Sequence, residues 1–182
     1  AKIALVVSDN KRAYALKRAE KASIETLFLD PVAFGSMDEF DREIIKNLKK
    51  RDIGLIVLAG YMRLLSAHLV RTYRNRIMNI HPALLPAFKG KNGIKDAFLY
   101  GVKITGPTVH FVTENVDSGP IISQAAVEVR DSDTESSLRE RIHKEEYKIY
   151  PKAVKDFVEG RLKIDGRRVV YKRASHGTFL AR

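Results

Sequence analysis

Two short segments contain the side chains with the clearest potential for chemistry. Residues 78–82 read Met-Asn-Ile-His-Pro, and residues 116–120 read Val-Asp-Ser-Gly-Pro. Asn79 and His81 are two positions apart, so on a strand both side chains face the same side. The Asn79 amide can donate a hydrogen bond to an oxygen that becomes negative.

Asp117, if close to His81, would raise the pKa of the imidazole and fix its orientation. Through a water, Asp117 could also accept a proton from an attacking amine. This trio predicts direct acyl transfer from a donor to an amine, which needs no Ser or Cys nucleophile.

These side chains need a strand end and a loop to hold them, and the pattern of the chain predicts both. Apolar runs alternate with segments of helical periodicity, as in an α/β domain. Strands are expected at residues 3–7, 26–29, 53–58, 76–80, 108–112 and 121–127, with a terminal hairpin at 162–164 and 169–171. Helices are expected at residues 11–22, 36–50, after Ser66, at 93–100 and from 132 onward. Capping boxes at 36–39 and 132–135 indicate two helix starts, and Pro151 is expected to kink or interrupt the last helix.

Two prolines stiffen the loop that follows the Asn79–His81 segment. Pro82 and Pro86 each fix their own φ angle and restrict the residue before them. We therefore expect the pair to lie on a rigid corner at the end of its strand.

Six sequence motifs resemble those of the phosphoribosylglycinamide formyltransferases, a folate-dependent family of purine synthesis. The motifs are LAGYMRLLS at 58–66, NIHPALLP at 79–86, GPTVHFV at 106–112, DSGPII at 117–122, EYKIYP at 146–151 and EGRL at 159–162. They follow the family's order and spacing from near the start of the chain to about residue 165. The resemblance implies an α/β fold with a doubly wound, mostly parallel sheet flanked by helices, in a single catalytic domain that spans residues 1–182.

The resemblance also implies a reaction and a set of site residues. The formyl group of 10-formyltetrahydrofolate would pass to the amine of 5′-phosphoribosylglycinamide, with no metal. Asn79 and His81 would polarise the formyl oxygen, while Asp117 would hold His81 and relay a proton. The pterin pocket would be formed by Met62, Arg63, Leu64, Leu65, His110 and Val112. The phosphoribosyl substrate would contact Gly60, Tyr61, Glu146 and His143, with Glu146 at the ribose hydroxyls and His143 near the phosphate.

The start of the chain departs from the family pattern. The family begins with a strand and a Gly-rich loop that holds the substrate phosphate through backbone N–H groups at a helix N-terminus. This chain has no glycine before Gly35, and residues 3–14 resemble the family's second strand and the helix after it. The first strand-plus-helix unit is therefore expected to be absent. A fragment, a truncation and a divergent member with a rebuilt phosphate site are the three explanations.

Composition indicates the class of protein and its partners. The chain has 182 residues, a formal net charge of +11 and no Cys, which excludes disulfides and thiolate metal sites. Lys and Arg alternate with Glu, so the positive charge favours anionic metabolites over nucleic acid. No run of about 18 apolar residues occurs, so neither a membrane span nor a membrane partner is expected. We expect a cytoplasmic monomer or homodimer whose basic tail, from about Lys172, is mobile.

Several other functions and roles stay open at this point. A 10-formyltetrahydrofolate hydrolase would use the same trio with water as the acceptor, and a non-catalytic folate-binding or RNA-binding derivative is a further alternative. A methionyl-tRNA formyltransferase is disfavoured because its RNA-binding domain is missing. His110 alternates with apolar neighbours and could be a hydrogen-bonded core residue, whereas His68 and His176 are expected at the surface. A metal triad of His81, His110 and Asp117 is disfavoured because no close His-x-x-x-His pattern occurs.

Overall fold

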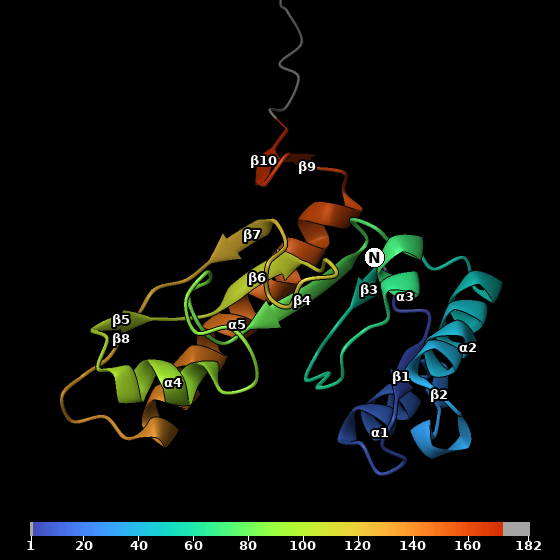
Figure 1. Ribbon diagram of the computed structural model, residues 1–182, viewed down its shortest axis with the longest axis horizontal. Coiled ribbons are helices and arrows are strands. Elements are labelled where there is room, and N and C mark those ends of the chain that lie inside the picture. The colour runs from blue at the N-terminus through green and yellow to red at the C-terminus, as the bar shows by residue number, and fades with distance from the viewer. Residues whose placement is uncertain (1, 173–182) are drawn as a thin grey trace, which may run out of the picture. The chain divides into compact units, whose positions relative to one another are not determined.

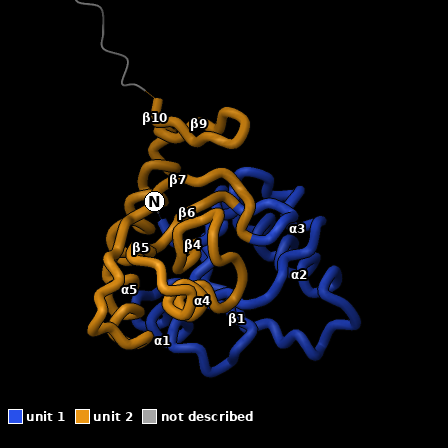
Figure 2. The backbone as a smooth tube through the Cα atoms, turned by 60° about the vertical axis from the view of Figure 1, so that its left-hand side comes forward, with its two compact units in different colours: residues 1–79, 112–116 blue, residues 80–111, 117–182 orange. Residues whose placement is uncertain are grey.

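The expected strands and helices occur along the chain in the expected order. The computed structural model describes residues 2–172, and the expectations about the basic tail after Lys172 and about His176 lie outside that range. Figure 1 shows the elements. Figure 2 colours the two compact units into which they divide. The first unit contains residues up to Asn79 and Val112–Val116, and the second contains Ile80–Phe111 and the described residues from Asp117.

The strand pairs of the first unit are parallel. β1 (Val6–Ser8) pairs with β2 (Thr26–Phe28), and β3 (Ile56–Val57) pairs with the start of β4 (Ile77–His81). The helices of this unit are α1 (Tyr14–Lys21), the 3-10 helix η1 (Pro31–Ala33), α2 (Met37–Lys50) and α3 (Ala67–Thr72). The core of the unit joins the apolar faces of α2 and α3 to β4 through Ile45, Leu48, Leu69, Val70, Tyr73 and Ile77. β3 is shorter than the apolar run 53–58 predicts, although the Leu58 N–H just after it also donates to the Met78 carbonyl oxygen, at 2.9 Å.

The second unit adds antiparallel pairs. β6 (Thr108–Phe111) pairs with β7 (Ile121–Gln124), β9 (Leu162–Asp165) with β10 (Arg168–Tyr171), and β5 (Ile104–Thr105) with β8 (Val127–Glu128). β10 also lies parallel to β7, so the strand order within this unit is β6-β7-β10-β9. The helices are α4 (Gly93–Tyr100) and α5 (Glu135–Val158), and α5 packs on β6 and β7. The expected α/β fold with a mostly parallel sheet and flanking helices is confirmed, as is the terminal hairpin.

Of the local predictions about α5, the cap at Ser132 and an interruption at Pro151 are wrong, while a kink at Pro151 stays a prediction. The cap is Thr134 rather than Ser132: its hydroxyl accepts the Ser137 N–H while the Ser137 hydroxyl accepts the Thr134 N–H. Pro151 does not interrupt the helix, which continues to Val158. A proline removes one backbone hydrogen bond, and the packing of α5 on the sheet offsets that loss. The box at 36–39 is half correct, because Ser36 caps α2 but the Glu39 carboxylate accepts from the N–H of Gly35.

One glycine is required by a close approach of two backbone segments. Gly106 has φ of +142°, and a Cβ there would clash with the carbonyl oxygen of Ala125. Only glycine allows this turn to lie against the chain that leaves β7. In the described part of the chain, no helix combines the length and the apolar character needed to cross a membrane.

Candidate active site

His81 ends β4 in a buried position between two oxygen acceptors. Its side chain is 3% exposed, with Nε2 2.7 Å from the carbonyl oxygen of Phe88 and Nδ1 3.3 Å from Oδ2 of Asp117. A carbonyl can only accept, so the short contact places a proton on Nε2. The neutral ring has one N–H for two acceptors, and a second proton would satisfy both. The site is therefore arranged to receive a proton on the ring.

Asp117 joins His81 to a second buried imidazole. Its Oδ2 accepts the N–H of Gly90 at 2.8 Å, and its Oδ1 lies 3.5 Å from Nε2 of His110. His110 Nδ1 is 2.9 Å from the carbonyl oxygen of Phe111, which sets the orientation of its ring. Asp117 has φ of +45°, a left-handed conformation that is uncommon outside glycine and is tolerated best by Asp and Asn. The structure thus brings together three of the predicted site residues, His81, His110 and Asp117.

Burial and hydrogen bonding lower the pKa of both ionisable partners. Burial lowers the pKa of His81, although the Asp117 charge and the Phe88 carbonyl raise it in part. Burial raises the pKa of Asp117, but the His110 contact, the Gly90 N–H and the charge of His81 together hold it below the ordinary value. Asp117 raises the pKa of His81 as expected, but desolvation of the ring has the larger effect, so the pKa lies below its ordinary value. Near neutral pH the site consists of a carboxylate and a neutral imidazole.

This charge state predicts how stability depends on pH. The unfolded chain binds a proton at His81 near the ordinary pKa of about 6.5, whereas the folded chain does so only at lower pH. The free energy of unfolding should therefore fall as pH decreases from above about 6.5 towards the folded-state pKa. Urea denaturation of the wild type and His81→Gln at pH 7.5 and 5.5 (about one unit on either side of that pKa) measures the difference. The variant should lose part of the pH dependence, and exposed His68→Gln should keep it. Equal pH dependence in the wild type and His81→Gln would contradict the assignment.

The backbone of Gly93 lies against the His81 ring. A Cβ on this buried first residue of α4 would lie 3.0 Å from Nε2 of His81 and 3.1 Å from the Phe88 carbonyl oxygen. The helix start therefore approaches the ring as closely as its backbone permits.

A buried threonine, which sequence reasoning missed, holds the loop after His81. The Thr108 hydroxyl donates to the carbonyl oxygen of Ala83 at 2.7 Å and accepts the N–H of Leu85 at 3.0 Å. Gln124 Nε2 donates to this hydroxyl and to the Leu85 carbonyl, both at 3.0 Å. The strand period could have revealed Thr108, because it is two positions from His110 and shares its side of β6.

Thr108→Val should lower the free energy of unfolding by about 2 kcal/mol, because it leaves the Leu85 N–H and the Ala83 carbonyl without their partner. Thr105→Val is the matched control: Thr105 is also buried, but its hydroxyl has no hydrogen-bond partner among the described residues. Its stability should change by less than about 0.5 kcal/mol. Urea denaturation measures both variants, and equal losses would contradict the role assigned to the Thr108 hydroxyl.

Of the residues predicted to contact the pterin, all except His110 belong to the first unit. Met62 and Leu64 are 60% and 69% exposed, whereas Leu65 and Val112 pack on the core of this unit. Arg63 lies over the ring of Phe40, on α2. The predicted substrate contacts beside them are Gly60, with φ of +64°, and Tyr61, whose pKa burial and the Asp41 charge raise to about 12. This arrangement leaves two large apolar side chains available to a flat ligand.

Two further predicted residues lie together on α5, one helical turn apart. His143 Nε2 is 3.9 Å from Oε2 of Glu146, whose side chain is 18% exposed. Burial raises the pKa of Glu146, and the nearby His143 opposes that rise. Asn79, the remaining predicted catalytic residue, lies half-buried on β4, two positions before His81.

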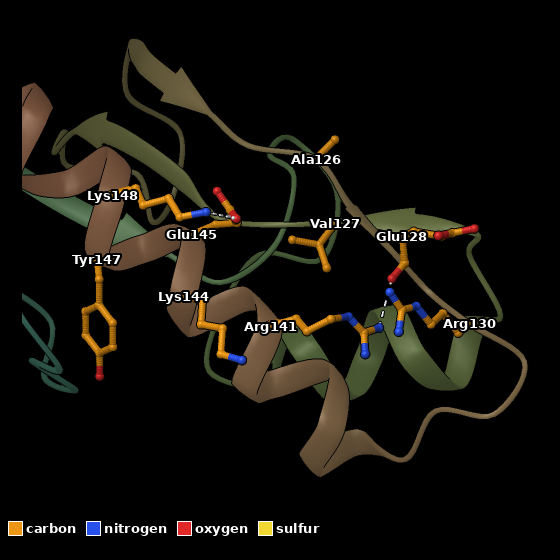
Figure 3. A pocket seen from close by; sticks show the side chains of 9 residues that line it. All are labelled: Ala126, Val127, Glu128, Arg130, Arg141, Lys144, Glu145, Tyr147 and Lys148. Atoms are coloured by element: carbon orange, nitrogen blue, oxygen red, sulfur yellow. Dashed lines mark hydrogen bonds and ion pairs between the residues drawn. The ribbon is translucent and has the colours of Figure 1, made fainter.

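A cavity of about 510 Å³ lies between α5 and β8 in the second unit (Figure 3). Arg130, Arg141, Lys144 and Lys148 line it, and none of the predicted site residues does. Arg141 is held by Asp133, and Lys148 by Glu145. The cavity is therefore separate from the His81–Asp117 arrangement. Within residues 2–172, no group of three or more His, Cys, Asp or Glu side chains is placed to hold a metal ion.

Comparison with known proteins gives consistent matches. Residues 1–154 match the family model described as formyl transferase. A phosphoribosylglycinamide formyltransferase of Bacillus subtilis is 42% identical over 158 residues, 87% of this chain and 81% of that protein. The human trifunctional purine biosynthetic protein adenosine-3 is 40% identical over 164 residues, 90% of this chain but 16% of that protein. The crystal structure of glycinamide ribonucleotide transformylase 1 from Symbiobacterium toebii superposes with a TM-score of 0.90 at 49% identity, over 92% of this chain and 79% of that one.

Proposed function

This chain belongs to the formyl transferase family, and we propose that it transfers the formyl group of 10-formyltetrahydrofolate to the amine of 5′-phosphoribosylglycinamide. The observation that carries the proposal is the buried His81, held between the Phe88 carbonyl and Asp117 at the end of β4. The reaction is a step of purine biosynthesis, the process named for the trifunctional relatives.

The chemistry requires one negative oxygen to be stabilised and one proton to be moved. Attack of the amine nitrogen on the formyl carbon gives a tetrahedral intermediate with a negative oxygen. Collapse breaks the bond to the folate nitrogen, which gains a proton, while the amine nitrogen loses one. Asn79 is the proposed hydrogen-bond donor to the oxygen. The proton that the amine nitrogen loses passes through a water and Asp117 to Nδ1 of His81, so that positive charge develops beside that oxygen.

Asp117 has two proposed tasks in this sequence. Its carboxylate holds the His81 ring and stabilises the imidazolium once the ring is protonated. Through a water it accepts the proton of the attacking amine. Nε2 of His81 is engaged with Phe88, so a direct hydrogen bond from this nitrogen to the formyl oxygen requires that contact to open.

The remaining site residues bind the two substrates in this proposal. Met62, Arg63, Leu64, Leu65, His110 and Val112 are assigned to the pterin. Gly60, Tyr61, Glu146 and His143 are assigned to the phosphoribosyl substrate. The half-buried Glu146 carboxyl is suited to accept hydrogen bonds from ribose hydroxyls. A cytoplasmic location and a monomeric or homodimeric state stay predictions.

The full chain should be incubated with 10-formyltetrahydrofolate in the presence and absence of 5′-phosphoribosylglycinamide, and tetrahydrofolate formation followed. Turnover that requires the ribonucleotide is the expected result. Turnover without it would instead indicate a hydrolase, and folate binding without turnover in a folded sample would contradict the proposed function.

A further inference from the structure

One face of α2 holds the segment that contains the exposed Met62 and Leu64. Met37, Phe40 and Asp41 stand at positions i, i+3 and i+4, so they lie on the same side of the helix. Arg63 Nη2 is 3.0 Å from Sδ of Met37, and its guanidinium lies 5.6 Å from the centre of the Phe40 ring. These two contacts anchor the middle of the segment to α2.

Asp41 anchors the end of the same segment. Its carboxyl group is fully buried, and Oδ2 accepts the N–H of Ser66 at 2.6 Å. Ser66 is in turn the cap of α3, since its hydroxyl accepts the N–H of Leu69 at 3.2 Å. Asp41 thus determines the position at which residues 62–65 join α3.

The buried carboxyl group of Asp41 reduces the stability of the fold by more than its one hydrogen bond restores. Removal of an acidic side chain from water is unfavourable, and only one oxygen of Asp41 is compensated. The other oxygen and the hydroxyl of Tyr61 have no hydrogen-bond partner in the described part of the chain. An apolar residue would suit a core position on α2 better, so the core alone does not account for Asp41.

The exposure of Met62 and Leu64 shows why the contact between Asp41 and Ser66 matters for this segment. Met62 and Leu64 bury too little surface to hold their own backbone in place. Their placement therefore depends on the neighbours that are fixed, Arg63 and Ser66. A surface that must fit a flat ring gains from such rigid support.

We propose that Asp41 is a positioning residue for folate binding: by holding the Ser66 N–H it fixes residues 62–65 in the conformation that receives the pterin. This inference rests on the proposed function. It concerns the affinity for one substrate and not the chemical step.

Asp41→Ala removes the acceptor, whereas Asp41→Asn retains an oxygen that can accept the Ser66 N–H. In Asp41→Ala the KM for 10-formyltetrahydrofolate should rise by about tenfold, while the KM for the ribonucleotide changes by less than about twofold. Asp41→Asn should stay within about threefold of the wild type for both substrates. Hydrogen exchange at the Ser66 amide should be faster in Asp41→Ala than in Asp41→Asn. If the alanine variant does not fold, Asp41→Ser serves in its place, because its shorter side chain does not reach Ser66.

Leu16→Ala is the matched control for lost stability. Leu16 is buried on α1 in the same unit, away from this segment in the chain, and its truncation should leave the KM for the folate unchanged. An equal rise in Leu16→Ala, or an unchanged KM and unchanged Ser66 exchange in Asp41→Ala, would overturn the proposal. A wild type without ribonucleotide-dependent turnover would overturn the proposed function instead, and hydrogen exchange would still test the Asp41 anchor.

Discussion

Asp117→Asn is expected to lower kcat by about a thousandfold. Asparagine has the same shape and can still accept the Gly90 N–H, so the loop should keep its conformation. It lacks the charge that stabilises protonated His81, and it cannot accept the proton that the amine loses. Affinity for the folate should change by less than about threefold, because the pterin contacts are assigned to other residues.

Steady-state kinetics and equilibrium binding of 10-formyltetrahydrofolate separate these two effects. Asp131→Asn is the control, since Asp131 belongs to the same unit and forms an exposed ion pair with Lys103. Its kcat should remain within about twofold of the wild type. A near-normal kcat in Asp117→Asn would remove this carboxylate from the mechanism.

Asn79→Ala should lower kcat by about a hundredfold or more, the usual cost of one oxyanion donor. The loss should appear in kcat and in kcat/KM equally, because the hydrogen bond strengthens only as the formyl oxygen becomes negative. Single-turnover measurement with both substrates bound tests this directly. Asn92→Ala is the control, because the Asn92 side chain makes no capping hydrogen bond at the start of α4. An unchanged rate in Asn79→Ala would reject the donor role.

The charge states of His81 and Asp117 suit an enzyme that must accept a proton before it returns one. Both pKa values are lowered, so the carboxylate is charged and the imidazole neutral near neutral pH. Such a site can accept the proton that an attacking amine loses. The low exposure of both side chains keeps bulk water from competing for it.

The amino-acid sequence predicted the α/β order, the hairpin at the end of the described chain and the cap at Ser36, because these depend on neighbours in the chain. It also predicted that Asn79 and His81 share one side of a strand, and that Asp117 lies near His81. Local rules were insufficient in α5, which is capped by Thr134 instead of Ser132 and continues through Pro151. Two capping arrangements were available there, and tertiary packing outweighed one lost backbone bond.

The tertiary structure alone decided what surrounds the functional side chains. The partners of His81 and Asp117 at Phe88 and Gly90 are backbone groups, which every residue type except proline offers in full, so no side-chain pattern predicts them. Asp41 and Ser66 are 25 positions apart, and their contact exists only once α2 lies beside the segment. The charge state of His81 could likewise not be predicted from the sequence, because it depends on whether burial or the nearby carboxylate has the larger effect on the pKa of the ring. That balance depends on distances and exposure, which three-dimensional packing determines.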